Sequence, residues 1–291
     1  MSDGFLIVDK EPGMTSHDVV AMGRKALGTR KVGHAGTLDP MATGVLVLGF
    51  GNGTRLLQYI TDGDKSYTAT IVLGASTVTD DHEGEILQST DAHAVDDNDI
   101  TRILPAMVGT ISQRPSSVSA VKVGGERAYD RVRAGEIFEL AARTVTISSL
   151  HVLQIRHCES TTEVDIDVTC SAGTFIRAIA RDLGDELKVG GHLRTLRRTR
   201  VAGFTLDVAT SITNMKEKNF LALDLTDVAR RTFSTRALSA DEVRELSFGR
   251  ALSPSTSDEI TAAISAENIL IALLKNEGDK AKPVAVFAAA H

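Results

Sequence analysis

The sequence has few of the residues and patterns that mark secreted, metal-binding or membrane proteins. Its 291 residues include two cysteines, Cys158 and Cys170, and no tryptophan, and aromatic residues make up 4% of the chain. Two cysteines supply neither a disulfide framework nor a zinc-binding spacing, and they are typical of a reduced, cytoplasmic protein. No apolar run approaches the roughly 18 residues that a membrane-spanning helix needs, and the N-terminus lacks the basic start of a signal peptide. We therefore expect a cytoplasmic protein with an aliphatic core, without a membrane span and without a metal site.

Positive charge is also scarce overall, since 32 Lys and Arg residues face 38 Asp and Glu residues and the net charge is −6. Taken over the whole chain, this balance argues against a polyanionic partner. The distribution is uneven, however: residues 61–99 contain ten acidic residues and one lysine, whereas residues 172–200 contain seven basic and three acidic ones. Residues 23–31 add four basic residues and no acidic one. A charged run is most often a solvated face, but two such stretches leave phosphate binding open, because a guanidinium can donate two parallel hydrogen bonds to one phosphate.

Hydrophobic periodicity predicts strands with one buried face. Residues 66–73 and 163–170 both alternate between apolar and polar side chains, and Tyr67 lies on the apolar side of the first. Such strands favour an antiparallel or mixed sheet over a doubly wound parallel one. Helical spacing covers residues 16–27, with Ser16 as the expected N-cap, and residues 174–187. The expected fold class is α+β, with a mixed, mainly antiparallel central sheet and flanking helices.

A change of pattern near residue 220 predicts a second, smaller part of the chain. A short helix is expected at residues 240–246, a loop with Ser and Pro at residues 253–257, and short strands in the remainder. We therefore divide the chain into a domain of residues 1–222 and a small C-terminal module of residues 223–291.

The glycine-rich loop at residues 33–44, GHAGTLDPMATG, carries the strongest candidate for chemistry. Asp39 precedes a proline, which favours an extended backbone at the aspartate, and the loop's glycines allow close approach of a ligand. An isolated Asp-Pro more often forms a turn, but a carboxylate on a rigid loop can also act as a nucleophile or base. That role needs a cation to keep the carboxylate ionised, for which Arg177 is the candidate. It also needs a ring to stack on the substrate and a group that handles protons, for which Tyr67 is the candidate.

Other motifs are weaker. Residues 49–53, GFGNG, lack the third glycine at the spacing that a dinucleotide-binding loop requires, and they lack its downstream acid in a βαβ unit. The run Asp80-Asp81-His82-Glu83 is more typical of a solvated acidic turn than of a metal site, because contiguous side chains cannot all face one ion without a loop built for it. The chain contains neither an HExxH nor a GxSxG motif.

The loop at residues 33–44 is one of a series of motifs that resemble the TruB-type tRNA pseudouridine-55 synthases and follow one another along about 200 residues. The others lie at residues 6–16, 64–67, 79–84, 119–129, 171–184 and 196–199. Three departures from the family pattern are visible. Phe175 stands where a tyrosine is more usual, Val118 stands in place of a tyrosine, and the proline of the first motif is Pro12 rather than residue 11.

The resemblance implies the pseudouridine synthase fold, with a PUA-like RNA-binding module at residues 223–291. It also implies that the chain flips a uridine at position 55 of the tRNA T-arm loop out of its stack and isomerises it to pseudouridine. Asp39 resembles the essential aspartate, Arg177 its ion-pair partner, and Tyr67 the aromatic residue that stacks on the base and takes part in proton removal. Further contacts with the substrate are expected from Lys10, His34, Gly36, Leu38 and Leu196.

The tRNA T-arm is thus the expected partner, and we expect a monomer that uses no cofactor. An alternative from another functional class is a non-catalytic tRNA-binding or tRNA-folding module that uses the same cleft. A pure binder would not need Asp39, Tyr67 and Arg177 together, so the resemblance favours the enzyme.

Overall fold

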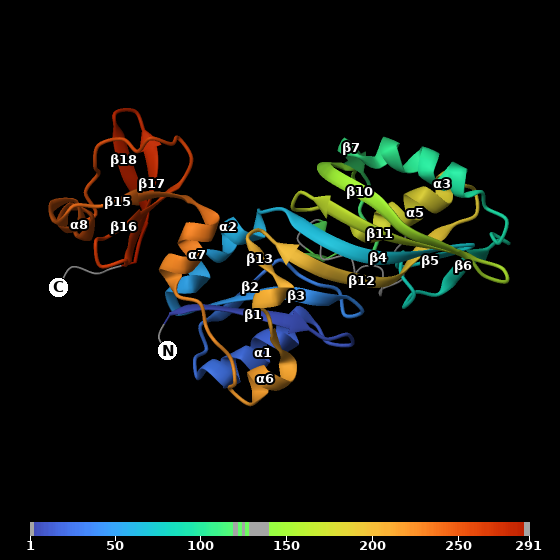
Figure 1. Ribbon diagram of the computed structural model, residues 1–291, viewed down its shortest axis with the longest axis horizontal. Helices are drawn as coiled ribbons and strands as arrows, with labels where there is room; N and C mark the ends of the chain where they lie inside the picture. The colour runs from blue at the N-terminus through green and yellow to red at the C-terminus, as the bar shows by residue number, and fades with distance from the viewer. Residues whose placement is uncertain (1–2, 119–121, 124–125, 128–139, 288–291) are drawn as a thin grey trace. The chain divides into compact units, whose positions relative to one another are not determined.

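The computed structural model of the chain describes residues 3–118, 122–123, 126–127 and 140–287 (Figure 1). These residues divide into two units, which we describe separately. Unit 1 contains the chain up to Leu38, Val45–Thr61 and the chain from Ala202 onward, and unit 2 contains Asp39–Gly44 and Asp62–Val201.

Unit 2 is built on strands that lie in the order β12, β4, β11, β10, β7, with each strand antiparallel to its neighbours. The five strands are β12 (Gly191–Val201), β4 (Lys65–Leu73), β11 (Thr162–Cys170), β10 (Arg143–His157) and β7 (Gly109–Gln113). The alternation predicted from the sequence is confirmed, because every second residue of β4 and of β11 is buried. On its other side, β12 pairs in parallel with the first two residues of β3 (Thr43–Phe50).

Helix α5 (Ile176–Glu186) packs on β12 and β4, and α3 (Asp97–Ile103) packs on α5 (Figure 1). The apolar stripe expected for this helix is confirmed by the burial of Ile176, Ile179 and Leu183. Gly184 allows the close packing, since a Cβ at this position would lie 2.2 Å from the backbone carbonyl carbon of Gly190. The smaller elements of unit 2 are β5 (Ala75–Thr77), β6 (Ile86–Ser89), η2 (Leu104–Met107), β8 (Lys122–Val123) and β9 (Glu126–Arg127).

Unit 1 contains strands in the order β14, β1, β3, with β2 pairing β3. Its α1 packs against β2 and α6, and α6 against β1 and β14. The elements are β1 (Gly4–Lys10), α1 (Ser16–Leu27), β2 (Val32–Ala35), η1 (Gly51–Arg55), α2 (Leu57–Thr61), β13 (Phe204–Thr205), η3 (Leu206–Val208), β14 (Thr210–Ser211) and α6 (Ile212–Lys216).

The expected N-cap of the first helix is wrong by one residue. Thr15 caps α1, and its hydroxyl and backbone form a reciprocal capping box with Asp18. The Ser16 hydroxyl instead accepts a hydrogen bond from the backbone N–H of Leu38, at 2.9 Å. Ser16 therefore anchors the residue that immediately precedes Asp39.

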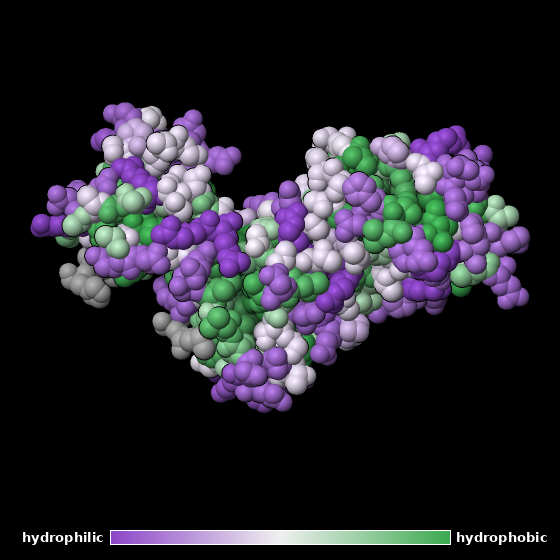
Figure 2. Space-filling model, viewed as in Figure 1, coloured by the Kyte–Doolittle hydropathy of each residue, from purple (hydrophilic) through white to green (hydrophobic). Residues whose placement is uncertain are grey.

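The C-terminal part of unit 1 carries a four-stranded sheet in the order β15, β16, β17, β18, and its visible outer surface is mainly hydrophilic (Figure 2). The elements here are α7 (Leu225–Thr232), β15 (Ser234–Ala237), α8 (Ala240–Ser247), β16 (Thr261–Ile264), β17 (Leu270–Glu277) and β18 (Lys280–Val286). Aliphatic side chains, among them Leu238, Leu246 and Leu274, form its core. The helix expected at residues 240–246 is thus confirmed.

The predicted fold class is also confirmed: the chain is α+β, with a mixed, mainly antiparallel sheet, flanking helices and a small C-terminal sheet. Within the described ranges, no helix is both long and apolar enough to cross a membrane.

Candidate functional site

An ion pair joins the two charged residues that the sequence singled out. Nε of Arg177 lies 3.0 Å from Oδ2 of Asp39. The side chain of Arg177, in the first turn of α5, is 6% exposed, whereas that of Asp39 is 37% exposed. The carboxylate is therefore held from one side by a buried cation and remains accessible from the other, as a group that acts on a substrate must be.

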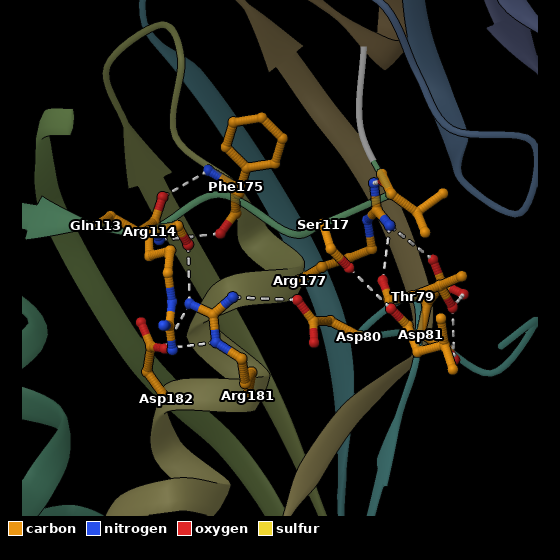
Figure 3. Close-up of polar contacts among 12 residues, drawn as sticks. Thr79, Asp80, Asp81, Gln113, Arg114, Ser117, Phe175, Arg177, Arg181 and Asp182 are labelled. Atoms are coloured by element: carbon orange, nitrogen blue, oxygen red, sulfur yellow. Dashed lines mark hydrogen bonds and ion pairs between the residues drawn. The ribbon is translucent and has the colours of Figure 1, made fainter. Parts of the chain in front are cut away.

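The remaining donors of Arg177 are held by unit 2 itself (Figure 3). Its Nη1 donates to the carbonyl oxygen of Thr79 at 2.7 Å and to Oδ2 of Asp81 at 3.2 Å, and its Nη2 donates to the carbonyl oxygen of Val118 at 2.9 Å. A guanidinium donates in a fixed, planar fork, so these three acceptors together with Asp39 leave it a single orientation. Arg177 is thus a rigid support for Asp39.

The acidic turn that supplies Asp81 corrects a prediction from the sequence. Asp80 and Asp81 were expected in a solvated turn, but they are 9% and 3% exposed. A second arginine of α5 explains the burial of Asp80, because Nη1 of Arg181 lies 3.2 Å from Oδ2 of Asp80 (Figure 3). Burial raises the pKa of the Asp80 carboxyl, and the charge of Arg181 opposes that rise.

Two arginines one helical turn apart therefore hold two consecutive aspartates. Residues 177 and 181 lie on the same face of α5 because i and i+4 are neighbours on a helix surface. Asp80 adopts a left-handed backbone with φ of 59°, an uncommon conformation for a residue other than glycine. The turn also joins β12, since the N–H of Leu193 donates to the carbonyl of Asp80 at 3.0 Å. Helix, turn and strand thus form one framework behind Arg177.

The start of α5 is fixed by a glutamine from β7. Phe175 is the N-cap residue, and its side chain cannot satisfy a backbone donor of the helix. Gln113, which is 1% exposed, accepts from the N–H of Phe175 at 2.8 Å and donates to its carbonyl at 3.0 Å. The ring of Phe175 lies 4.8 Å from the guanidinium carbon of Arg143, within the range of a cation–π contact.

Tyr67 lies in β4 and is 7% exposed. Its direct neighbour across the antiparallel β4–β12 pair is Arg198, which is 1% exposed. Burial raises the pKa of Tyr67, and the charge of Arg198 partly opposes this effect. Leu196, two residues before Arg198, is 7% exposed and pairs with Ala69.

Glycine is required where the Asp39 loop meets β12. Gly44 has φ of 101°, and its Cα is paired with that of Arg198. A Cβ here would lie 2.1 Å from the carbonyl oxygen of Arg198. The loop that carries Asp39 is therefore fastened to the strand that carries the partner of Tyr67.

The structure thus places Asp39, Tyr67, Arg177 and Leu196 in unit 2. The other four predicted substrate contacts belong to unit 1, where Lys10 is fully buried and donates to the carbonyl oxygens of Glu11 and Met14 at 3.0 and 2.7 Å.

The remaining three flank or lie within the loop between β2 and β3. His34 lies in β2 and makes an edge contact with the ring of His17, at 5.5 Å between centroids. Gly36 has φ of 79°, and Leu38 is 3% exposed. Their roles as substrate contacts stay predictions.

In the part of the chain that the structure describes, no group of three or more His, Cys, Asp and Glu residues is arranged to hold a metal ion. Of the motif at residues 119–129, positions 119–121, 124–125 and 128–129 lie outside the described residues.

Comparison with known proteins assigns this arrangement to a family. Residues 24–176 match the family described as TruB family pseudouridylate synthase (N terminal domain). Residues 177–227 match the tRNA pseudouridylate synthase B C-terminal domain, and residues 233–288 match tRNA Pseudouridine synthase II, C terminal. The chain belongs to the TruB family of pseudouridine synthases.

TruB-family relatives share about half of the sequence over nearly its whole length. The chain is 51% identical to tRNA pseudouridine synthase B of Arthrobacter sp. (strain FB24), covering 99% of this chain and 97% of the relative. It is 52% identical to tRNA pseudouridine synthase B of Nocardia farcinica (strain IFM 10152), covering 97% and 92%.

Solved structures share the fold. A Cbf5–Nop10–Gar1 complex contains a chain that is 24% identical, with a TM-score of 0.74 over 98% of this chain and 85% of that one. An H/ACA RNP bound to a substrate RNA contains a chain that is 22% identical, with a TM-score of 0.73 and the same coverage. At this identity the likeness supports the fold alone.

Three buried residues that contact or adjoin the candidate site were not singled out from the sequence: Asp81, Gln113 and Arg198. Asp81 and Arg198 belong to motifs that were recognised, but neither was given a role. The signal for Arg198 is its place two residues after Leu196 in the same motif. No local sequence pattern indicates Gln113, because its contribution depends on hydrogen bonds with Phe175 at the start of α5.

Proposed function

We propose that this chain isomerises a uridine of tRNA to pseudouridine. The observation that carries the proposal is the ion pair between the accessible carboxylate of Asp39 and the buried guanidinium of Arg177, in a chain of the TruB family. Support for tRNA as the substrate comes from the relatives named tRNA pseudouridine synthase B. We further propose the uridine at position 55 of the T-arm loop as the target.

The residues act on a base that leaves its stack, because the reacting bond is inaccessible inside a folded loop. Flipping a nucleotide costs a few kcal/mol of unstacking, and stacking on an aromatic ring offsets part of that cost. In this proposal Tyr67 stacks on the flipped base, Leu196 contacts it, and His34 takes its former place.

Asp39 supplies the essential carboxylate, and Arg177 orients it. The glycosidic bond to N1 breaks, the base turns, and a new bond forms between the sugar carbon and C5. A proton leaves C5 and another is taken up at N1, so that the product is an isomer and no atoms are gained or lost. Lys10, Gly36 and Leu38 complete the proposed set of residues that position the loop and the substrate.

The decisive test compares the wild type with Asp39→Asn on a tRNA transcript, with pseudouridine mapped by carbodiimide modification. We expect Asp39→Asn to fold and bind tRNA but to form no pseudouridine, because the amide keeps the shape of the carboxylate and loses its charge. Pseudouridine formation by Asp39→Asn would overturn the role of the aspartate. A wild type that binds tRNA without modifying it would instead identify a non-catalytic tRNA-binding or folding module.

We also propose a role for the C-terminal residues, a cellular compartment and an oligomeric state. Residues 223–291 would form a PUA-like module that binds RNA, an assignment supported by the small β-sheet of β15–β18 and the family match over residues 233–288. The enzyme would act in the cytoplasm. It would act as a monomer, with tRNA as its partner.

A further inference from the structure

Arg198 has no part in the function described above, yet it is among the largest side chains that are fully buried. Burying a guanidinium is costly unless its charge and its donors are matched inside the protein. Its neighbours in the same basic stretch are more accessible, since Arg194 is exposed and Arg197 and Arg200 are half-buried. A buried arginine among more accessible ones indicates a specific interaction inside the protein.

Tyr67 lies directly opposite Arg198 in the β4–β12 register, and both side chains are buried. The positive charge of Arg198 therefore acts on the phenol of Tyr67 at short range. Lys65 lies on the same face of β4, but its ammonium donates to the carbonyl of Gly63 at 2.8 Å. Of these two cations, Arg198 is the one whose Cα lies directly opposite that of Tyr67.

The backbone of Arg198 is held by strand pairing on both sides. β12 pairs antiparallel with β4 and parallel with the start of β3, so Arg198 has Tyr67 on one side and Gly44 on the other. Gly44 follows Asp39 by five residues along the loop, and Asp39 also attracts the charge of Arg198. Arg198 thus lies between the strand of Tyr67 and the end of the loop that carries Asp39.

We propose that Arg198 is the positioning residue for Tyr67: it holds the phenol oxygen in place and supplies the positive charge that lets this oxygen take the proton from C5 of the turned base. The inference rests on the proposed function. In this step the C5–H bond breaks and its electron pair forms the C5=C6 bond. The electrons of the C6=N1 bond move to N1, which then takes a proton from water. The C5 proton passes to Tyr67 in its phenolate form, and the phenol later releases it to water.

The charge of Arg198 is needed because Tyr67 lies in a poor environment for an anion. A general base works best when its pKa lies near the working pH, and burial moves the pKa of Tyr67 away from it, while Arg198 acts in the opposite direction. Asp39 and Cys170, which also act on Tyr67, add to the effect of burial. Of these neighbours, Arg198 alone favours the phenolate.

The experiment follows single turnovers of the full-length protein on tRNA that carries either uridine or 5-deuterouridine at the target position. The variants are Arg198→Gln, which removes the charge, and Arg198→Lys, which keeps the charge without the planar fork of donors. Arg181→Gln is the matched control, because it removes another arginine of unit 2 whose side chain is only 15% exposed but which pairs with Asp80 and Asp182.

We expect Arg198→Gln to slow turnover on the order of 10²-fold, in the range of a general base's contribution, and Arg198→Lys to slow it less. The deuterium isotope effect should rise above that of the wild type in both variants, because C5 proton removal becomes the slow step. tRNA affinity should stay within a factor of two or so, since Arg198 is buried. Arg181→Gln should lower the melting temperature and leave the isotope effect unchanged.

Three outcomes would overturn the role of Arg198. These are an unchanged rate, a slower rate with the isotope effect of the wild type, or failure of the charge-conserving Arg198→Lys to fold. The last result would show that the guanidinium is required for the fold itself. An inactive wild type would instead count against the proposed function, so the two failures are distinguishable.

Discussion

At the scale of single residues, the proposed mechanism gives each reacting group an arginine of its own. Arg177 forms an ion pair with Asp39, and Arg198 lies opposite Tyr67 in the sheet. Both guanidinium groups are buried, so each was placed by the fold before any substrate arrives. Preorganised charge of this kind is effective in catalysis because it needs no reorganisation at the moment of reaction.

The substitution Arg177→Lys tests the geometry of the first pair. Arg177 donates to Asp39, Asp81 and two backbone carbonyls, whereas an ammonium is a compact point charge that cannot reach all four. We expect a loss of turnover of about 10²-fold or more, comparable to the removal of a preorganised donor, measured at saturating tRNA. Arg181→Lys is the control, because it changes a neighbouring ion pair that does not contact Asp39. Equal turnover in Arg177→Lys and the wild type would contradict the importance of the ion pair.

At the scale of elements, the sequence predicted the structural features that depend on the pattern of residues within one segment. The alternation in β4 and β11 and the apolar stripe of α5 each arise within one segment, and each was confirmed. The burial of Asp80 and Asp81 could not be predicted in this way, because it depends on arginines about 100 residues away.

The placement of Arg198 was unpredictable for a different reason. β12 has register shifts on both sides of the stretch from 195 to 198, between Leu193 and Thr195 and between Arg198 and Arg200. Each shift breaks the two-residue alternation that assigns side chains to faces. A run of arginines therefore gives no sign of which member is buried. Asp39, Tyr67 and Arg177, by contrast, were found through motifs, and the structure brings all three into unit 2.

The pairing of β4 with β11 makes the stability of the protein depend on pH. Lys65 of β4 faces Cys170 of β11, and burial lowers the pKa of Lys65 from 10.5 to about 8. Between pH 8 and 10.5 the unfolded chain binds more protons at Lys65 than the folded chain, so the free energy of unfolding rises with pH there. Burial raises the pKa of Cys170 from 9.0 to about 11, and the thiol acts in the opposite direction above pH 9.

The effect of Lys65 is therefore clearest between pH 8 and 9. We expect the free energy of unfolding to increase by about 1 kcal/mol over this interval, since one pKa unit corresponds to roughly 1.4 kcal/mol. Urea unfolding at the two pH values measures it. In Lys65→Met, which cannot bind the proton, the increase should disappear. An equal increase in Lys65→Met and the wild type would assign the effect to another group.

At the scale of the whole molecule, the net charge of −6 is a sum over acidic and basic stretches of the chain. Two aspartates of the acidic stretch are buried in ion pairs, Asp80 with Arg181 and Asp81 with Arg177. The basic stretch at residues 23–31, by contrast, is largely exposed and includes Lys25, Arg30 and Lys31. Net charge is therefore a poor guide to the partner, since short-range contacts with phosphates depend on local charge within a Debye length of about 8–10 Å.

This distribution predicts that tRNA binding weakens steeply with salt in spite of the negative net charge. Each cation that neutralises a phosphate releases condensed counterions, so the logarithm of the binding constant falls linearly with the logarithm of the salt concentration. We expect Lys31→Gln to reduce the magnitude of that slope by about one, as for a single phosphate contact. Glu85→Gln, which neutralises an exposed acid of residues 61–99, should leave the slope unchanged. Filter binding over a series of salt concentrations measures all three slopes. A flat dependence in the wild type, or equal changes in the two variants, would mean that net charge rather than the local basic surface governs the encounter with tRNA.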